Sequence, residues 1–540
     1  MSVERLFESA PSHWRLTTLG ELAKSSGGDI QTGPFGSQLH ASDYVVDGIP
    51  SIMPKNISTD SVLTDDIARV SPEDIKRLAK YKVQVGDIVY SRRGDVEKCA
   101  RITPREDGWL CGTGCLRVRV LPAEVSTEYL HAYLCHPSVR EWIVRHAVGA
   151  TMPNLNTSIL SALPVYIPSE AEMNFIAATW LSISEKIQLN RQINQTLEQM
   201  AQAIFQSWFV DFEPVKAKIA AREDWLARQA AQSDAHDDVP QFSSPVCYAH
   251  EFADAAASAP ATQADLETFM NRAAMCAISG KTDADLDAMP TADYQHLYHT
   301  ASLFPDELVE SELGEIPKGW VVDLLGNSLS VLETGSRPKG GVAGINEGVP
   351  SVGAENIIGV GNYSYGKEKF VSREFFEKMK RGKVLDFDFL LYKDGGKPGD
   401  FKPRVSMFGC GFPYKEFAIN EHVFRIRSEI LGQPFLYFLI GHENVLSDLR
   451  NKGAKAAIPG INQSDVNSIR FVKPELPILT AFNASAQVFV ERILKFSLES
   501  LQLSNLRDSL LPKLLSGELD ISALTNLAAS SDAATGAAHV

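Results

Sequence analysis

Apolar and polar residues alternate with two different periods along this chain. Residues 81–91 (YKVQVGDIVYS) and 115–121 (CLRVRVL) are short β-branched runs interrupted by Gly and Asp, a pattern typical of strands and turns. Residues 383–392 and 422–427 show the same pattern in the second half of the chain. Each set is followed by a helical pattern, over 127–149 and 433–453. We therefore expect two mixed α/β (α+β) globules.

A second period marks two long helices. In residues 174–209 apolar positions recur at alternating steps of four and three, which is the heptad pattern of a coiled-coil seam. The same spacing recurs after residue 485. The predicted seam residues are Trp180, Ile183, Ile187, Asn190, Asn194, Leu197, Ile204, Phe489, Ile493, Phe496, Leu503 and Leu510. Polar residues within such a seam reduce stability and often fix register. We favour pairing of the two helices over the alternative, in which each lies on its own domain.

The two halves of the chain are repeats of each other. GIPSIMPKNI (48–57) is echoed by GVPSVGAENI (348–357), and the alignment places Val70, Asp87 and Gly94 on Val371, Asp388 and Gly395. ATMPNLNTS (150–158) likewise matches AAIPGINQS (456–464). So long a period indicates a tandem duplication of whole domains and excludes a solenoid.

These patterns divide the chain into six segments. Residues 1–168 and 319–474 form the two repeated globules, each followed by a long helix, over 169–213 and 475–520. Residues 214–318 join the repeats and contain linker-like stretches and short helical patterns. The small polar tail 521–540 is predicted to be disordered.

Composition and charge change this picture only at two points. The formal net charge of -15 does not weigh against DNA binding, because residues 214–318 alone carry -11 and residues 320–475 are slightly positive. The chain has no apolar run long enough to span a membrane and no secretory signal at its start, so a cytoplasmic location is expected. The seven scattered cysteines do not predict a disulfide framework.

No catalytic motif stands out in the sequence. It lacks a phosphate-binding GxxxxGK[ST] loop, an HExxH zinc motif, a GxSxG nucleophile elbow and an Asn/Asp-Pro-Pro-aromatic element. CGTGC (111–115) with Cys135 and His136 departs from the CxxC spacing of zinc sites, so reduced structural cysteines are expected and no metal is assigned. The repeat-equivalent Asp87 and Asp388 are expected at turns or strand edges.

The polar loops are suited to recognition instead. They carry amides, hydroxyls, guanidiniums and ammonium groups, which bind base edges and phosphates. The repeats agree at framework positions and differ in these loops, as expected for two domains that read different sequences. The candidate DNA-binding residues are Gln31, Thr32, Ser37, Lys55, Asn56, Arg92, Arg93, Arg337, Lys339, Asn356, Lys393, Lys397, Lys402 and Arg404.

Together these elements resemble the specificity (S) subunits of type I restriction-modification enzymes. The resemblance spans nearly the whole chain and rests on these segments: WRLTTLGEL (14–22), TGPFGSQL (32–39), GIPSIMPKNI, the MPNLN and IPGIN turns, FVDFEPVKAK (209–218), SLFPDELVESELGEIPKGW (302–320) and LRDSLLPKLLSGEL (506–519). Residues 225–300 resemble the family least.

The resemblance implies two target-recognition domains that each read half of a bipartite, asymmetric site in double-stranded DNA, and two long helices paired antiparallel as a spacer. The chain itself would be non-catalytic and hold no cofactor. Two modification (methyltransferase) subunits would use S-adenosylmethionine, and restriction subunits would use ATP and magnesium. Two other readings stay open: a stand-alone DNA- or partner-binding scaffold of a defence system without a methylase, and a nuclease with unrecognised carboxylates.

Overall fold

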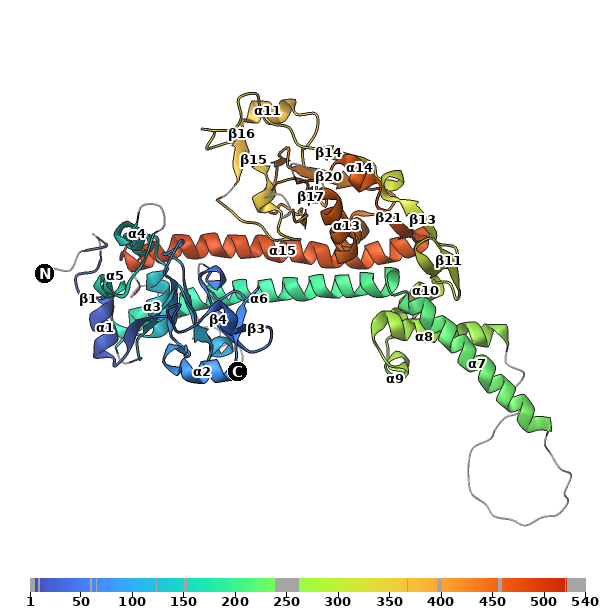
Figure 1. Cartoon of the computed structure of the whole chain (residues 1–540), viewed down its shortest axis with the longest axis horizontal. Helices are drawn as coiled ribbons and strands as arrows, with labels where there is room; N and C mark the ends of the chain where they lie inside the picture. The colour runs from blue at the N-terminus through green and yellow to red at the C-terminus, as the bar shows by residue number, and fades with distance from the viewer. Residues whose placement is uncertain are drawn as a thin grey trace, which may run out of the picture. The chain divides into compact units, whose positions relative to one another are not determined.

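The computed structural model of the 540-residue chain describes residues 5–7, 10–58, 61–64, 66–122, 124–149, 153–237, 262–366, 368–395, 401–454, 459–519 and 521. The chain divides into two compact units. The first unit contains residues 1–189 and 500–540, and the second contains residues 190–499. Each unit holds one of the predicted globules together with parts of both long helices (Figure 1). The predicted tail 521–540 lies outside the described residues, apart from Ile521.

The globule of the first unit is built on three sheets. Strand β1 (Arg15–Thr18) pairs antiparallel with β10 (Pro164–Ile167), which brings the ends of the globule together. The four-stranded antiparallel sheet has the order β2 (Asp29–Thr32), β9 (Cys115–Arg119), β6 (Ile88–Ser91), β7 (Cys99–Arg101). A mixed sheet has the order β3 (Tyr44–Val45), β5 (Ala68–Val70), β4 (Ile49–Ile52), β8 (Leu110–Cys111). The helices of this globule are α1 (Leu19–Ser25), α2 (Pro72–Arg77), α3 (Thr127–Leu134), α4 (Pro137–His146) and α5 (Thr157–Ala162).

The globule of the second unit repeats this topology. Strand β13 (Val321–Leu324) pairs with β21 (Arg470–Lys473), as β1 pairs with β10. The four-stranded sheet has the order β14 (Val331–Thr334), β20 (Val423–Arg427), β17 (Phe389–Tyr392), β18 (Val405–Met407), and the mixed sheet has the order β16 (Lys369–Val371), β15 (Val349–Val352), β19 (Ala418–Ile419). The helices are α11 (Arg373–Lys378), α12 (Gln433–Gly441), α13 (Glu443–Gly453) and α14 (Gln463–Asn467). The predicted α/β class and the duplication are confirmed.

The repeated decapeptide is a framework element. Its first half forms β4 in one globule and β15 in the other, and its second half forms a short 3₁₀ turn. In each turn an asparagine side chain accepts the backbone N–H three residues earlier, Met53 to Asn56 at 3.1 Å and Gly353 to Asn356 at 3.1 Å. The decapeptide pattern therefore recurs because both globules need the same strand and the same turn closed by an asparagine side chain.

The repeat-equivalent aspartates are buried in ion pairs. Asp87 accepts the N–H of Gln84 at 2.8 Å and receives two hydrogen bonds from Arg119. Asp388 accepts the N–H of Leu385 at 2.7 Å and pairs with Arg425 and Arg427. Both carboxylates close the turn that precedes a central strand, as predicted for turn residues.

The two long helices are α6 (Glu170–Phe209) and α15 (Leu476–Leu515). Within the second unit Asn190 donates to Glu499 at 2.8 Å, whereas the ring of Phe205 contacts that of Phe482. Residue numbers therefore rise along one helix as they fall along the other, and the pairing is antiparallel. Within the first unit Trp180 and Arg507 meet in the same sense, with the guanidinium 4.6 Å from the ring. The predicted antiparallel coiled coil is confirmed.

The seam residues differ in how deeply they are buried. Trp180, Ile187, Asn190, Leu197 and Ile493 are buried, as a seam position requires. The other predicted seam positions are half-buried: Ile183, Asn194, Ile204, Phe489, Phe496, Leu503 and Leu510. Phe489 and Phe496 pack against the core of the second globule, and the buried residues nearby are Val490 and Leu494. Helix α15 thus packs apolar side chains against the second globule as well as against helix α6.

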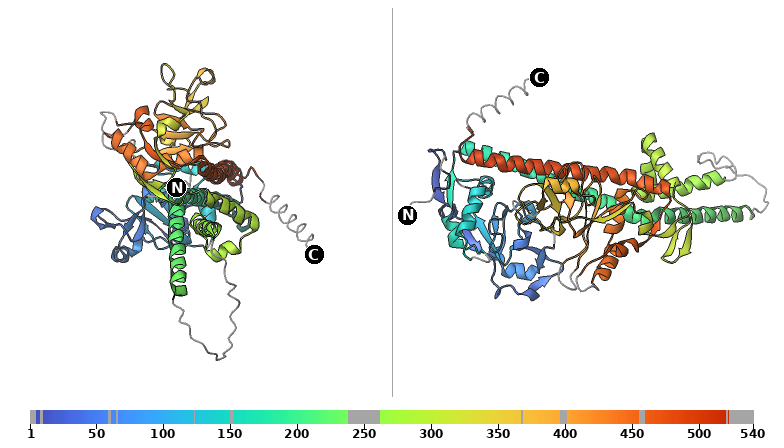
Figure 2. Two further views of the ribbon diagram at one scale, coloured as in Figure 1. Left: turned by 90° about the vertical axis from the view of Figure 1, so that its right-hand side faces the viewer. Right: turned by 90° about the horizontal axis from the view of Figure 1, so that it is seen from above.

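A helical connector follows α6. It contains α7 (Glu213–Asp237), α8 (Gln263–Ser279), α9 (Asp283–Asp287) and α10 (Thr291–Ser302), and ends in the hairpin β11 (Leu308–Ser311) and β12 (Gly314–Pro317). Helices α7 and α8 lie side by side (Figure 2), and Trp225 contacts Phe269 between them. The Nζ of Lys218 in α7 donates to the carbonyl of Phe304 at 2.6 Å, which ties this helix to the end of the connector. In the described parts of the chain, no helix is long and apolar enough to cross a membrane.

Candidate nucleic-acid interface

In both globules a recognition loop leaves the sheet at an equivalent glycine. Thr32 and Thr334 end strands β2 and β14, and Gly33 and Gly335 follow them. A Cβ atom at Gly33 would lie 2.1 Å from the carbonyl oxygen of Gly112, and one at Gly335 would lie 1.7 Å from that of Ile419. Only glycine allows this approach of two backbones. After this fixed point the sequences diverge, to PFGSQ in the first loop and SRPKG in the second.

Hydrogen bonds to Gln38, from inside the loop and from neighbouring residues, hold the loop of the first globule in place. The N–H of Phe35 donates to the side chain of Gln38 at 3.3 Å, and Tyr81 donates to the same side chain at 2.7 Å. Arg77, at the end of α2, donates to the carbonyl of Gln38 at 2.6 Å. The guanidinium of Arg92 lies 5.7 Å from the exposed ring of Phe35. This loop and the loop after β6 therefore form one surface.

The loop after the central strand is pinned by backbone hydrogen bonds in both globules. In the first, Leu155 N–H donates to the carbonyl of Arg92 at 2.9 Å and Gly94 N–H to that of Pro153 at 3.3 Å. We call this paired contact the backbone latch. Asn156, in the same turn, accepts the N–H of Ile159 at 2.9 Å and caps α5.

The second globule has an equivalent backbone latch. Ile461 N–H donates to the carbonyl of Lys393 at 2.7 Å, and Gly395 N–H donates to that of Pro459 at 3.1 Å. Asn462 caps α14 as Asn156 caps α5. The aligned MPNLN and IPGIN turns thus serve the same purpose. The first holds the loop that contains SRRG, and the second holds the loop that contains YKDGG.

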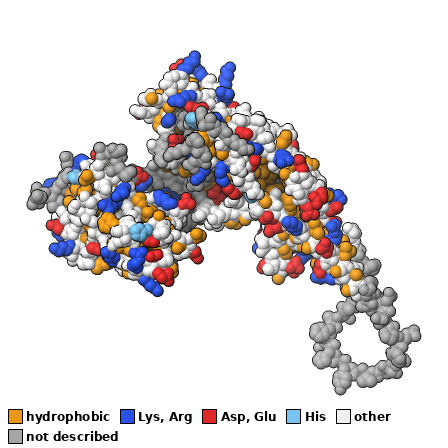
Figure 3. Space-filling model, viewed as in Figure 1, with side chains coloured by type: hydrophobic (Ala, Val, Ile, Leu, Met, Phe, Trp, Pro, Cys, Tyr) orange, Lys and Arg blue, Asp and Glu red, His pale blue; other side chains and the backbone are white. Residues whose placement is uncertain are grey.

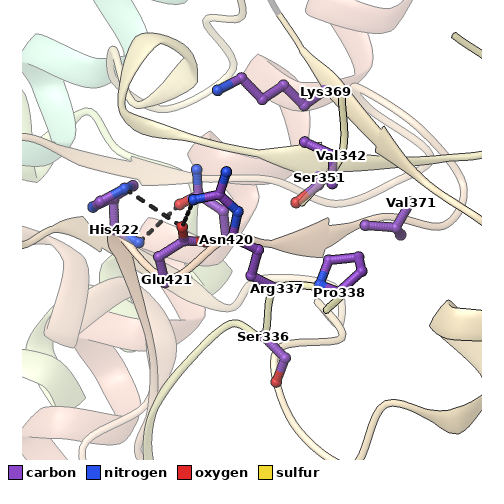
Figure 4. Close-up of a pocket in the computed structure, with 10 residues that line it drawn as sticks. All are labelled: Ser336, Arg337, Pro338, Val342, Ser351, Lys369, Val371, Asn420, Glu421 and His422. Carbon is purple, nitrogen blue, oxygen red and sulfur yellow. Dashed lines mark hydrogen bonds and ion pairs between the residues drawn. The ribbon is translucent and has the colours of Figure 1, made fainter. Parts of the chain in front are cut away.

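A shallow cleft opens beside the loop of the second globule (Figure 4). Its volume is about 60 Å³, and its lining residues are Ser336, Arg337, Pro338, Val342, Ser351, Lys369, Val371, Asn420, Glu421 and His422. Arg337 donates to Glu421 at 3.2 Å, and the Nε2 of His422 lies 3.7 Å from the same carboxylate. The other ring nitrogen of His422 contacts Asp394, which also pairs with Lys393. This cleft offers donors and acceptors together, which is what base-edge recognition requires.

The same place in the first globule has different chemistry. The strand registers align Cys111 with Ile419 and Cys115 with Val423, so Gly112, Thr113 and Gly114 stand where the second globule has Asn420, Glu421 and His422. At this place the first globule carries two glycines and a hydroxyl. The equivalent place in the second globule carries an amide, a carboxylate and an imidazole. The two globules are built alike and would contact different groups.

Among the described predicted DNA-binding residues, six are exposed, five are half-buried and two are buried. Ser37, Lys55, Arg93, Arg337, Lys339 and Lys402 are exposed, and Gln31, Thr32, Arg92, Lys393 and Arg404 are half-buried. Gln31 accepts a hydrogen bond from Arg117 at 3.0 Å. Arg404 donates to the carbonyl of Ala354 at 2.7 Å, with its guanidinium 4.9 Å from the ring of Tyr392. Lys397 lies outside the described residues.

Asn56 and Asn356 require a correction. Both side chains are buried, at 0% and 1% exposed, and each closes its 3₁₀ turn by accepting a backbone N–H. Asn356 also donates to the carbonyl of Ser364 at 3.1 Å. These contacts use the amides inside the protein, so we withdraw both residues from the predicted DNA interface.

A basic group was missed at the end of the short helix in each globule. Lys76, Arg77 and Lys80 are exposed at the end of α2, and Lys378, Lys380 and Arg381 are exposed at the end of α11. Figure 3 shows Lys and Arg side chains gathered at the α11 end of the second globule. The sequence signal was available, because IKRLAK and FEKMKR align in the repeat. Exposed cations flanking a loop surface are typical phosphate contacts.

The two cysteines of CGTGC are buried in an apolar cluster that does not contain Cys135. Burial raises the pKa of Cys111 to about 12 and raises that of Cys115 well above the ordinary thiol range. His136 accepts the N–H of Ser138 at 3.0 Å and caps α4. Cys135 instead lies 3.9 Å from Cys99, sulfur to sulfur, and 3.6 Å from the Nε2 of His131.

Comparison with known proteins shows which class this chain is similar to. Residues 11–199 match the family model "Type I restriction modification DNA specificity domain". The HindI specificity subunit of Haemophilus influenzae is 25% identical over 86% of this chain and 94% of its own length. The MjaIX specificity subunit of Methanocaldococcus jannaschii is 23% identical over 75% of this chain and 72% of its own length. A crystal structure of an S subunit from M. genitalium covers 95% of this chain and 98% of its own chain, with a TM-score of 0.42 and 12% identity.

Residues 11–199 are thus similar to a type I restriction-modification DNA specificity domain, and most of the chain is similar to curated type I specificity subunits. These similarities agree with the resemblance drawn from the sequence.

Proposed function

We propose that each globule of this specificity subunit reads one half of a bipartite, asymmetric DNA site. The observation that carries the proposal is the pairing of a duplicated framework with non-duplicated loops. Equivalent strands, glycines and backbone latches present Gly112–Gly114 in one globule and Asn420–His422 in the other. Because base edges differ in their donors and acceptors, these two sets of groups would select different bases.

Phosphate contacts would come from the basic residues at the ends of α2 and α11. Arg77 touches the first recognition loop directly through the carbonyl of Gln38. Strand β16, which lines the cleft of the second globule through Lys369 and Val371, leads straight into α11. Cations so placed would fix the position of the duplex, while the loops and the cleft would contact the bases.

The reaction itself would belong to partner subunits. Two modification subunits would carry S-adenosylmethionine and methylate adenine, and restriction subunits would use ATP and magnesium. The specificity subunit would select the site and position these partners on it. Two similar globules joined by antiparallel helices offer two similar docking faces, which supports binding of two copies of the same modification subunit.

Exchanging one globule tests the proposal. Residues 1–168 would be replaced by the corresponding residues of a related specificity subunit, in cells that carry the complete system, and methylated adenines would be mapped across the genome. One half of the recognised site is expected to change and the other half to persist. The reciprocal exchange of residues 319–474 should alter the complementary half.

The outcome that contradicts the proposal is a change in both halves, or in neither, for a chimera that still assembles. Assembly is checked by co-purification of each chimera with the modification subunit. If the intact chain binds DNA specifically but never co-purifies with a modification subunit, the stand-alone scaffold is the correct description.

A further inference from the structure

A buried cluster of soft ligands lies inside the first globule. Cys99 belongs to β7, His131 lies in α3, and Cys135 immediately follows that helix. Their three ligand atoms lie within 4.8 Å of one another, and all three residues are buried. His131 and Cys135 are four residues apart, so they project from the same side of the helix end. The cluster joins a strand of the main sheet to the helix that covers it.

The distances fit a tetrahedral metal site. The two sulfurs are 3.9 Å apart, and the Cys135 sulfur is 3.6 Å from the Nε2 of His131. A tetrahedral zinc ion with Zn–S bonds of ~2.3 Å and Zn–N bonds of ~2.0 Å separates sulfur from sulfur by about 3.8 Å and sulfur from nitrogen by about 3.5 Å. The Cys99–Cys135 and Cys135–His131 distances therefore already match those of a tetrahedral zinc site.

Cysteine binds a metal ion as the thiolate, so a divalent cation at this site would displace the protons of Cys99 and Cys135. Arg140 lies within hydrogen-bonding reach of the Cys135 sulfur.

One further polar group faces the cluster. Tyr90 lies directly opposite Cys99 in the β6–β7 pairing and is fully buried. Its hydroxyl interacts with the Cys99 thiol but has no hydrogen-bond partner of normal geometry among the described residues. A water bound to the metal ion would supply such a partner.

We propose that Cys99, His131 and Cys135 bind one zinc ion, with the fourth position next to Tyr90. Thiolate and imidazole are ligands that zinc prefers, and a set of two cysteines and one histidine leaves the fourth tetrahedral position open to water. Such soft donors disfavour hard cations such as magnesium. The site would clamp β7 to the end of α3. Because the ring of His131 also contacts Trp180 of α6 edge-on at 6.2 Å, the clamp would extend to the base of the long helix. Arg140 would remain beside the thiolates as a donor to sulfur.

Metal content of the full-length chain tests this inference. The protein would be purified without chelators and without a histidine tag, and zinc would be measured by mass spectrometry. One zinc per chain is expected. The chain would also be refolded with cobalt chloride, and the d–d bands of tetrahedral cobalt with a thiolate-to-cobalt charge-transfer band are expected.

Matched variants locate the ion. Cys99→Ser and Cys135→Ser should each lower metal content at least tenfold, whereas Cys276→Ser, in α8 of the second unit, should keep one equivalent. If the ligand variants do not fold, the cobalt spectrum of the unaltered chain decides alone. A chain refolded with excess zinc or cobalt that holds no metal overturns the proposal, and so does metal that survives loss of both cysteines.

Discussion

Arg119 holds Asp87 through two parallel hydrogen bonds, from Nε at 2.7 Å and from Nη2 at 2.6 Å. Asp87 is 2% exposed, and its repeat equivalent Asp388 is fully buried against Arg425 and Arg427. Both copies of the repeat thus keep the buried carboxylate. The arginines that pair with it differ between the two copies. Arg425 also pairs with Glu333 at 2.8 Å, where the first globule has Gln31 next to Arg117.

Removing either buried carboxylate should destabilise its own globule. Asp87→Asn and Asp388→Asn leave guanidiniums without their anion, and breaking a buried pair in this way costs about 3–5 kcal/mol. Urea unfolding measures the loss. The control is Asp95→Asn, because Asp95 is an exposed partner of Lys98 and should change stability by less than about 1 kcal/mol. Equal effects at Asp87 and Asp95 would show that the buried pair is not structural.

The turn asparagines should affect folding and leave the recognised DNA sequence unchanged. Asn56→Ala and Asn356→Ala each remove the acceptor of a backbone N–H, which costs about 1–3 kcal/mol. Thermal unfolding gives the loss, and methylome mapping in cells with the complete system gives the site. A stable variant with an altered half-site would restore these residues to the DNA interface.

The sequence predicted the architecture because duplication exposes the framework. Positions that matched across the repeat, such as Gly94 with Gly395 and Pro153 with Pro459, are those whose backbones make the same hydrogen bonds. The long helices were visible from their period alone.

The predicted DNA interface was harder to define from sequence. Asn56 and Asn356 look like free polar loop residues in sequence, and only the fold shows their amides turned inward onto the 3₁₀ turn. The residues Asn420–His422 were missed because they lie at and just before the start of the segment 422–427, which stands out in the sequence only for its apolar, strand-like pattern. Their role depends on the strand register that places them beside Arg337. Cys99 was not grouped with Cys135 because 36 residues separate them in the chain.

The polar pair in the helix seam should show measurable coupling. Asn194 donates to the Oγ of Ser497 at 3.0 Å, and Ser497 is 7% exposed. Either single alanine substitution should lower the free energy of unfolding by about 0.5–1.5 kcal/mol. The double variant should lose less than the sum of the two, since both partners are then absent. Guanidinium unfolding of the four proteins provides the cycle, with Thr196→Ala as an exposed control on the same helix. Strict additivity would mean that the two side chains do not interact.

The connector should become more stable as the pH rises above neutrality. Burial lowers the pKa of Lys218 to about 8 from its ordinary 10.5, although Asp306 and Glu267 oppose the shift. Between these values the unfolded chain binds a proton that the folded chain has released, so raising the pH favours the folded state. The gain reaches at most about 3 kcal/mol.

Hydrogen exchange of α7 and α10 between pH 7.5 and 10, corrected for the intrinsic exchange rate, measures this dependence. Lys218→Met removes the titrating group, so the wild-type protein should gain protection relative to this variant as pH rises. An identical pH dependence in both proteins would contradict the assignment.

The backbone latch has a consequence for how such proteins diversify. It joins Arg92 to Leu155, and Lys393 to Ile461, through main-chain atoms alone. Under the proposed function, a codon change at position 92, 93 or 393 would replace the chemical group offered to a duplex without disturbing the turn that carries it. New sequence preferences would then arise by single substitutions on an unaltered scaffold, and each globule would change its choice of bases while the other keeps its own.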